Sequence, residues 1–449
     1  MPANPHQTPS LPTLTRAIVW NQALWTAGHS LTTGGFLLYF GQELGATGLW
    51  IALLLAIPET VGVIGLATRR VIHWLGGRKR TWLICFVLAR LFALGIPLLA
   101  FRQLRPSTSE PLGFMVVFLV LSEAFGSIAY VAYLSWLSDL APESHWGRFF
   151  AKRDISQFAI LLIVPVFGGY ARDFWRRLVT EQTWSPDTAL LAYVVTFAVG
   201  ISLQLVSMIP LLRLPDVAVR APTAALPQWQ MLVEAWKDRS MRFLLIHNWW
   251  LAAANGLTQA AFFSYLFGPL GIGLGTYYLL LNVMNATKIP VSYYAGRICD
   301  QRGNKRLLLN SVFIVSHSLL FWLWATPEKW WLVFGAYFMW GGFAAVNIAG
   351  GNLALKLAPR SDNSAHLALF RQVGGLVAGI SGLLGGLWLD SLRRESFVVW
   401  LGDYRLEAYQ LLFLISWVGR ASAALWILPI REPTPRPANA GPLGTPEES

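Results

Sequence analysis

Five ionisable side chains lie inside long apolar stretches of the sequence: Glu59, Arg90, Glu123, Lys288 and Arg420. A charge in the middle of a bilayer costs about 3 kcal/mol or more, so such a residue usually has a partner or a function. The chemistry open to these groups is ion pairing, proton transfer and attraction of a charged solute. They are therefore the first candidates for a functional site.

Glu59 and Arg90 stand at similar depths in two consecutive apolar stretches. At a helical rise of about 1.5 Å per residue, each lies about 15 Å from the same end. Consecutive helices are commonly neighbours, so we expect a structural ion pair between these two residues. The alternative is that Glu59 carries protons and that its protonation responds to the charge of Arg90.

Lys288 has no acidic residue at matching depth in its own half of the chain. It either pairs with Glu123 from the other half or faces a hydrated cavity and attracts an anionic solute. Glu59, Arg90, Glu123 and Lys288 are thus candidates for coupling or for structural ion pairs. Arg420 lies in the last apolar stretch, where snorkelling or local pairing is expected.

Hydrogen-bonding side chains recur at helical spacing in several of the apolar stretches. Asn248, Asn255 and Gln259 fall on one face of a helix, at positions i, i+7 and i+11. Hydrogen bonding between helices is the alternative to a binding role for each amide. The candidate substrate-binding residues are Asn21, Trp25, His29, Glu123, Asn248, Asn255, Gln259, Asn285, Lys288 and Asn347.

The composition indicates that membrane helices position these residues. The chain has 449 residues, of which 55% are hydrophobic and 13% charged, whereas soluble domains carry about 25% charged residues. A spanning helix needs about 20 apolar residues. Twelve stretches qualify, at about 17–40, 48–68, 81–101, 112–136, 154–172, 189–212, 242–267, 272–295, 307–326, 330–355, 369–389 and 407–430. The predicted fold is an all-α membrane protein with twelve transmembrane helices.

Lys and Arg are concentrated in the short segments on the side of the two chain ends. This distribution predicts that both termini are cytoplasmic, in an integral multi-pass protein of the plasma (inner) membrane. The formal net charge of +12 is spread over those segments and forms no single basic face. We therefore expect the lipid bilayer and a small-molecule solute as partners, no nucleic acid, and a monomer.

The two halves of the chain resemble each other. Gly168-Gly169 and Asp173 in the first half recur as Gly385-Gly386 and Asp390 in the second. The pattern predicts two pseudo-symmetric six-helix bundles, a common plan for transporters with a midplane site. The expected domains are disordered tails at 1–15 and 431–449, bundles at 16–212 and 242–430, and a linker at 213–241 with an interfacial amphipathic helix.

The stretch YAGRICDQRGNKR, Tyr294–Arg306, separates the eighth and ninth apolar stretches. Its glycines allow a tight turn, and its aspartate can accept hydrogen bonds from arginines or from a helix start. Such a charged latch can hold two bundles together. The spaced residues of this candidate gating motif are Gly296, Arg297, Asp300, Gly303, Lys305 and Arg306.

Here the chain resembles the major facilitator superfamily of secondary transporters, whose loops 2–3 and 8–9 carry G-x-x-x-D-x-x-G-x-K/R-K/R. The first-half loop keeps the basic run Arg78, Lys79 and Arg80, but Trp74 stands where Asp300 stands in the second half. The resemblance implies that helices 1, 4, 7 and 10 line a central cavity and helices 2, 5, 8 and 11 flank it. It also implies transport of a small solute by alternating access, with proton coupling left open.

Two other functions remain as alternatives. A transport-inactive sensor or scaffold could use the same fold. A membrane-embedded enzyme would need a clustered His/Asp/Glu set, a zinc motif or a nucleophile elbow, none of which the sequence contains. We therefore expect no enzymatic activity, no metal and no cofactor.

Overall fold

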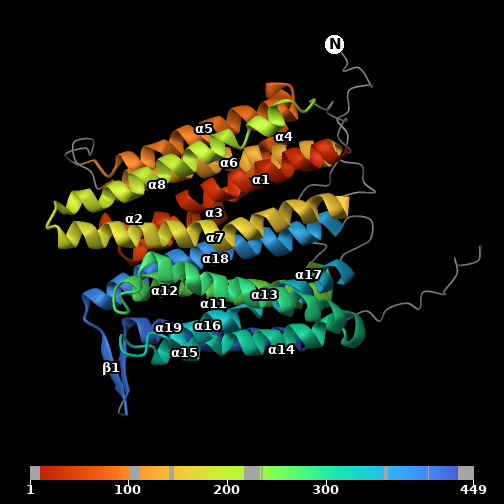
Figure 1. Cartoon of the computed structure of the whole chain (residues 1–449). Helices are drawn as coiled ribbons and strands as arrows, with labels where there is room; N and C mark the ends of the chain where they lie inside the picture. The colour runs from red at the N-terminus through yellow and green to blue at the C-terminus, as the bar shows by residue number, and fades with distance from the viewer. Residues whose placement is uncertain are drawn as a thin grey trace, which may run out of the picture.

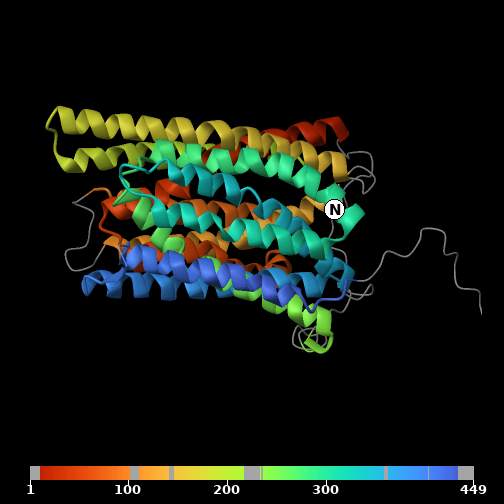
Figure 2. The same ribbon diagram turned by 90° about the horizontal axis from the view of Figure 1, so that it is seen from below.

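The computed structural model describes residues 11–101, 111–140, 146–216, 236–357, 363–402 and 404–432, together with residue 233. Almost all of these residues form helices that run along one common direction (Figure 1, Figure 2). In Figure 1 the helices of the first half lie above those of the second half. Residues 1–10 and 433–449 of the predicted tails, and most of the predicted linker helix, fall outside the described residues, whereas residues 11–15 belong to a helix.

The first half forms six rods, several of them interrupted. Its elements are α1 (Leu11–Thr32), α2 (Gly35–Glu43), α3 (Gly48–Val61), η1 (Gly62–Ala67), α4 (Thr68–Leu75), α5 (Arg78–Leu98), α6 (Pro111–Leu140), α7 (Trp146–Glu181), α8 (Pro186–Val206) and α9 (Ile209–Leu212). Gly34, with a φ of 57°, separates α1 from α2. A side chain is strained in this left-handed region, which explains the glycine at the break.

The second half repeats this plan and adds one β-hairpin. Its elements are α11 (Arg239–Leu257), α12 (Gln259–Phe267), α13 (Leu274–Arg302), α14 (Asn304–Ser316), α15 (Ser318–Trp324), α16 (Leu332–Trp340), α17 (Phe343–Leu357), α18 (Asn363–Arg394), β1 (Val398–Leu401), β2 (Tyr404–Glu407), α19 (Ala408–Ser422) and η4 (Ala423–Ile427). The hairpin is antiparallel and pairs Val398 with Glu407. Sequence analysis did not predict it.

Nine helical segments of the described chain are long and apolar enough to cross a membrane. They correspond to the predicted spans 2 to 6 and 9 to 12. The three remaining rods are α1–α2, α11–α12 and α13, which carry most of the polar candidate residues. These three rods lie at the other three predicted spans, so the described helices are consistent with the predicted twelve, and the chain is an integral multi-pass membrane protein.

Three apolar clusters form the core, and they divide the molecule along its length. We call the end that carries the β1–β2 hairpin the hairpin end, and the end near residues 11 and 432 the terminal end (Figure 1). One large cluster at the hairpin end joins both halves, for example through Phe36, Tyr278 and Phe413. At the terminal end each half has its own cluster, around Trp136 in the first half and Leu308 in the second.

Candidate functional site

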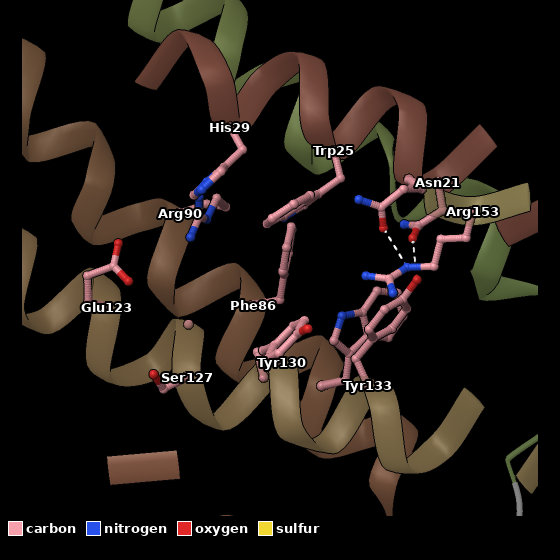
Figure 3. A pocket seen from close by; sticks show the side chains of 14 residues that line it. Asn21, Trp25, His29, Phe86, Arg90, Glu123, Ser127, Tyr130, Tyr133 and Arg153 are labelled. Carbon is pink, nitrogen blue, oxygen red and sulfur yellow. Dashed lines mark hydrogen bonds between the residues drawn. The ribbon is translucent and has the colours of Figure 1, made fainter. Parts of the chain in front are cut away.

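A cavity of about 290 Å³ lies within the first half, between α1, α5, α6 and α7 (Figure 3). Its wall includes four of the predicted candidates, namely Asn21, Trp25, His29 and Glu123, and also Arg90. Trp25 and His29 lie four residues apart on α1, and their rings stack at a centroid distance of 4.5 Å. The Nδ1 atom of His29 is buried without a hydrogen-bond partner in the described structure.

Arg90 lies at one end of this cavity and is only 8% exposed. Its Nη1 donates a hydrogen bond to the side-chain oxygen of Gln204 on α8, and its guanidinium lies 5.3 Å from the ring centroid of Phe86. Gln204 in turn donates to Thr32 at 3.0 Å. Glu123 on α6 lies at the same end of the cavity, next to Arg90 in Figure 3, and the two opposite charges attract each other.

The predicted ion pair between Glu59 and Arg90 is not formed. Apart from the turn that joins them, the two rods are not neighbours, because α3 packs against α6 and α18 while α5 packs against α6 and α8. Glu59 instead lies beside Gly375 of α18. A Cβ atom added to Gly375 would be 3.7 Å from the Oε2 atom of Glu59. The assumption that consecutive helices pack together was wrong for this pair.

The other end of the cavity contains a hydrogen-bond network that sequence reasoning missed. Arg153 of α7 donates from Nε to Gln22 at 2.7 Å. Tyr133 donates to Asn21 at 2.8 Å, and the amide of Asn21 donates to the carbonyl of Ser207 at 2.7 Å. Asn21 therefore ties three helical segments together. Arg153 belongs to a basic segment, and a basic segment between two spans is already explained by membrane topology. The sequence therefore contained no further feature that placed Arg153 in a cavity.

A second cavity of about 380 Å³ lies within the second half, between α11, α14, α17 and α18. Its wall contains the predicted candidates Asn248, Asn255 and Asn347, together with His247. Asn248 donates to the carbonyl of Phe370 at 2.6 Å. The Oδ1 atom of Asn255 is buried and has no hydrogen-bond partner among the described residues.

Lys288, Asn285 and Gln259 do not line either cavity. Lys288 is half-buried on α13 and its Nζ lies 3.4 Å from the Oδ1 of Asn285. The helix α13 packs on α7, α16 and α17, whereas Glu123 is on α6, which packs on α3 and α5. The suggested pair between Lys288 and Glu123 is therefore not formed. Arg420 is buried and does not snorkel: it donates to Ser416 on its own helix and to Thr258 between α11 and α12.

The second-half loop motif ends one helix and starts the next. Gly303 separates α13 from α14 with a φ of 85°. The backbone N–H groups of Asn304 and Lys305 donate to the carboxylate of Glu432 at 3.0 and 2.9 Å, and Lys356 pairs with the same carboxylate at 2.9 Å. The side chain of Asp300 lies outside the described residues.

Burial opposes ionisation of Glu432, but the hydrogen bonds from Lys305, Lys356 and Asn304 outweigh it and lower the pKa of this carboxyl from 4.5 to about 2. The first half uses the same design with Asp216, whose carboxylate lies 3.4 Å from the backbone nitrogen of Lys79. A Cβ on Gly77 would lie 2.7 Å from Asp216. The described contacts of both loops therefore connect helices within one half and not between the halves.

Contacts between the halves occur at the hairpin end. Asp390 of α18 accepts hydrogen bonds from the backbone N–H groups of Gly48 and Leu49, at the start of α3, both at 2.9 Å. Asp173 of α7 accepts from Leu274 and Gly275, at the start of α13, at 3.2 and 2.9 Å. Each half thus caps a helix of the other half. The repeated Asp173 and Asp390 were visible in the sequence, but their role was not.

Several solved transporters have the same arrangement of helices. A mutant of the nucleoside transporter NupG aligns over 93% of this chain and 99% of its own, at a TM-score of 0.65 and 14% identity. A D-xylose–proton symporter and a bacterial homologue of the iron transporter ferroportin, solved in an inward-facing state, each align over 94% of this chain and 99% of their own, at a TM-score of 0.65 and 13% identity. The chain has the major facilitator superfamily fold.

No protein-family model and no curated protein sequence matches the chain. At 13% to 14% identity, the likeness concerns the arrangement of the helices alone. Within the major facilitator fold, the resemblance led us to expect helices 1, 4, 7 and 10 around the cavity. All four contribute to the two cavities described above, but these are separate cavities within the two halves and not one central cavity, and helices 3 and 9, as α5 and α14, line them too.

Proposed function

We propose that this chain is a secondary transporter that moves a small solute across the membrane by alternating access. The observation that supports the proposal is the unequal division of the apolar core. The halves share one cluster at the hairpin end and have separate clusters at the terminal end. Two bundles that separate at one end while remaining joined at the other can expose a site to each side in turn.

The positions of the cavities support the same function. The first-half cavity is bounded by α7, which packs against α13 of the other half. The second-half cavity is bounded by α18, which packs against α3. The helices that form the interface between the halves therefore also form cavity walls. A rocking motion at this interface changes the shape of both cavities.

We further propose that the described state is open toward the cytoplasm and that Glu123 couples transport to protons. The concentration of Lys and Arg at the terminal end supports a cytoplasmic position for that end. Glu123 lines a cavity, and no side chain of the described residues forms a hydrogen bond with it. A carboxyl group in this position can exchange a proton with a cavity that opens to either side.

Purified protein in proteoliposomes tests the proposal. We expect accumulation of a solute that stabilises the protein in a thermal-shift screen, and faster uptake with an inward proton gradient. Glu123→Gln should remove the effect of the gradient while the protein still binds the solute. Stabilisation by a solute without any uptake of that solute would overturn the carrier function and favour a sensor.

A further inference from the structure

We infer that the first-half cavity binds a small organic monoanion with a flat apolar body, and that Arg90 holds its anionic group. This inference rests on the proposed carrier function, which it extends to a class of solute. The cavity wall contains two guanidinium groups, Arg90 and Arg153, against one carboxylate, Glu123. The excess of one positive charge favours a solute with a single negative charge.

The free edge of Arg90 has the geometry for a carboxylate. Gln204 occupies Nη1, whereas Nε is buried and has no hydrogen-bond partner among the described residues. No described hydrogen bond uses Nη2 either, which lies toward Gly126 on the cavity side. Nε and Nη2 form one edge of the guanidinium plane, and a carboxylate can accept a hydrogen bond from each of them.

The environment of Arg90 makes such an anion favourable. A buried guanidinium without a direct anionic partner is costly, and this cost falls when a carboxylate binds to it. Among the described residues Arg90 forms a hydrogen bond only with the neutral Gln204, and the nearby carboxylate of Glu123 attracts it without forming a hydrogen bond or an ion pair (Figure 3). A bound anion would therefore complete a site that the described protein groups leave unfilled.

The remaining wall selects the body of the solute. The stacked Trp25–His29 pair, Phe86 and Tyr130 line the space between the two arginines (Figure 3). Aromatic faces of this kind favour a flat ring that can stack on them. The volume of about 290 Å³ is at the lower limit for small-molecule sites, about 300 Å³, so it suits one ring better than a peptide or a disaccharide.

The second-half cavity differs in this respect. Its wall contains the three amides of Asn248, Asn255 and Asn347 and the ring of His247, and no Lys, Arg, Asp or Glu among the described lining residues. The charge that selects the solute is therefore confined to the first half. Lys288, the anion-binding residue suggested by sequence, does not line either cavity.

The test compares acids with their neutral amides. Isothermal titration calorimetry on the purified full-length protein at pH 7 would use benzoate, salicylate and nicotinate, each against the corresponding amide. We expect at least one acid to bind about tenfold or more tightly than its amide, a difference that one charge-assisted contact supplies. The inference is overturned if no acid binds more tightly than its amide.

Substitutions then locate the site. Arg90→Gln should abolish the preference for the acid, and Arg90→Lys should restore only part of it, because an ammonium group cannot form the paired contact. A substitution that only disturbs the structure of the cavity would weaken binding of the acid and of the amide alike. The ratio of the acid affinity to the amide affinity therefore reports recognition of the charge. Loss of the preference in Lys288→Gln, or its retention in Arg90→Gln, would contradict the inference. Lys329→Gln, at an exposed lysine of the hairpin end, is the control for a change in net charge.

Uptake separates this inference from the carrier function. If the acid binds through Arg90 but proteoliposomes do not accumulate it, the anion site stands and the carrier function fails. If the proteoliposomes accumulate only neutral or cationic solutes and Arg90→Gln has no effect, the carrier function stands and the anion class is wrong.

Discussion

The two ends of the molecule use the same chemical device for different purposes. At both ends a carboxylate accepts hydrogen bonds from the first N–H groups of a helix, where negative charge is favourable. At the hairpin end, Asp173 and Asp390 cap helices of the opposite half. At the terminal end, Asp216 and Glu432 cap helices of their own half. Only the hairpin-end contacts must therefore break when the halves separate there, and the terminal-end contacts move with each half.

The packing of glycines strengthens this contrast. A Cβ added to Gly386 would lie 2.6 Å from the carbonyl oxygen of Gly48, and one added to Gly169 would lie 2.9 Å from Gly275. These pairs bring the backbones of the two halves together beside each capping aspartate. The hairpin end is thus closed both by charge and by shape, and the two contributions can be disturbed separately.

The largest expected effect comes from disturbing the shape. Gly386→Val places a side chain against the backbone of Gly48, and overpacking of this kind costs about 1–3 kcal/mol. We expect the variant to favour a state that is open at the hairpin end and to lose most uptake. Spin labels at positions 44 and 269, after replacement of Cys85 and Cys299, would show a longer distance between the halves.

The matched control is Gly113→Val, because a Cβ on Gly113 has no neighbour within 4 Å. It should leave both the distance and the uptake as in the unmodified protein. An unchanged distance distribution in Gly386→Val would mean that the close approach of these helices does not keep the hairpin end closed.

A smaller effect is expected when only the charge is removed. Asp390→Asn or Asp173→Asn weakens one cap by about 1 kcal/mol, which corresponds to a change of about fivefold in the ratio of closed to open molecules. The double variant should show approximately the sum of the two free-energy changes, because the caps are separate contacts. The same spin-label pair measures the ratio, and equal populations in the single variants and the unmodified protein would refute the role of the caps.

Glu432 should affect stability without affecting the hairpin end. Its pKa is about 2 in the folded protein and 4.5 as the ordinary value, so its contribution is present above pH 4.5 and is lost as the pH falls from 4.5 toward 2. Between pH 4.5 and 2, the unfolding temperature of the unmodified protein should therefore fall more steeply with decreasing pH than the unfolding temperature of Glu432→Gln. A shift of the hairpin-end distance in Glu432→Gln would contradict the division between the two ends.

Asp216→Asn should have the smallest effect. Its contact with the nitrogen of Lys79 is 3.4 Å long and exposed, whereas the contacts of Glu432 are shorter and partly buried. We expect a change in the free energy of unfolding within about 0.5 kcal/mol, the usual range for surface sites. Thermal unfolding at pH 7 measures it. A loss as large as that of Glu432→Gln would show that the two halves are equivalent at this end.

The sequence predicted the arrangement of helices better than the contacts between them. Apolar length is a local signal, and it found the nine spans that the described helices confirm. The predicted pair of Arg90 with Glu59 was wrong because an ion pair depends on which helices are neighbours. Here α6 packs against both α3 and α5, which carry these two residues. The sequence analysis assigned Lys288 to a binding site because it is charged. Which face of α13 lines a cavity is decided by how α13 packs against its neighbours, which the sequence does not show.

Residues of the cavity in the first half were only partly predictable. Trp25 and His29 share one face of a helix by their spacing alone, which a sequence reveals. Arg153 and Tyr133 reach the cavity from other helices, and only the fold brings them to α1. The acids at positions 216 and 432 follow the last helix of each half, far in sequence from the loops that they cap, so no local motif indicated them.

The β1–β2 hairpin interrupts the resemblance between the halves, because the corresponding connection in the first half, between α7 and α8, contains no strand. It carries the exposed Trp400 and turns at the exposed Gly402. An epitope inserted at this turn would mark one face of the protein without touching the cavities. Antibody labelling of intact cells would then show directly which face of the protein lies outside.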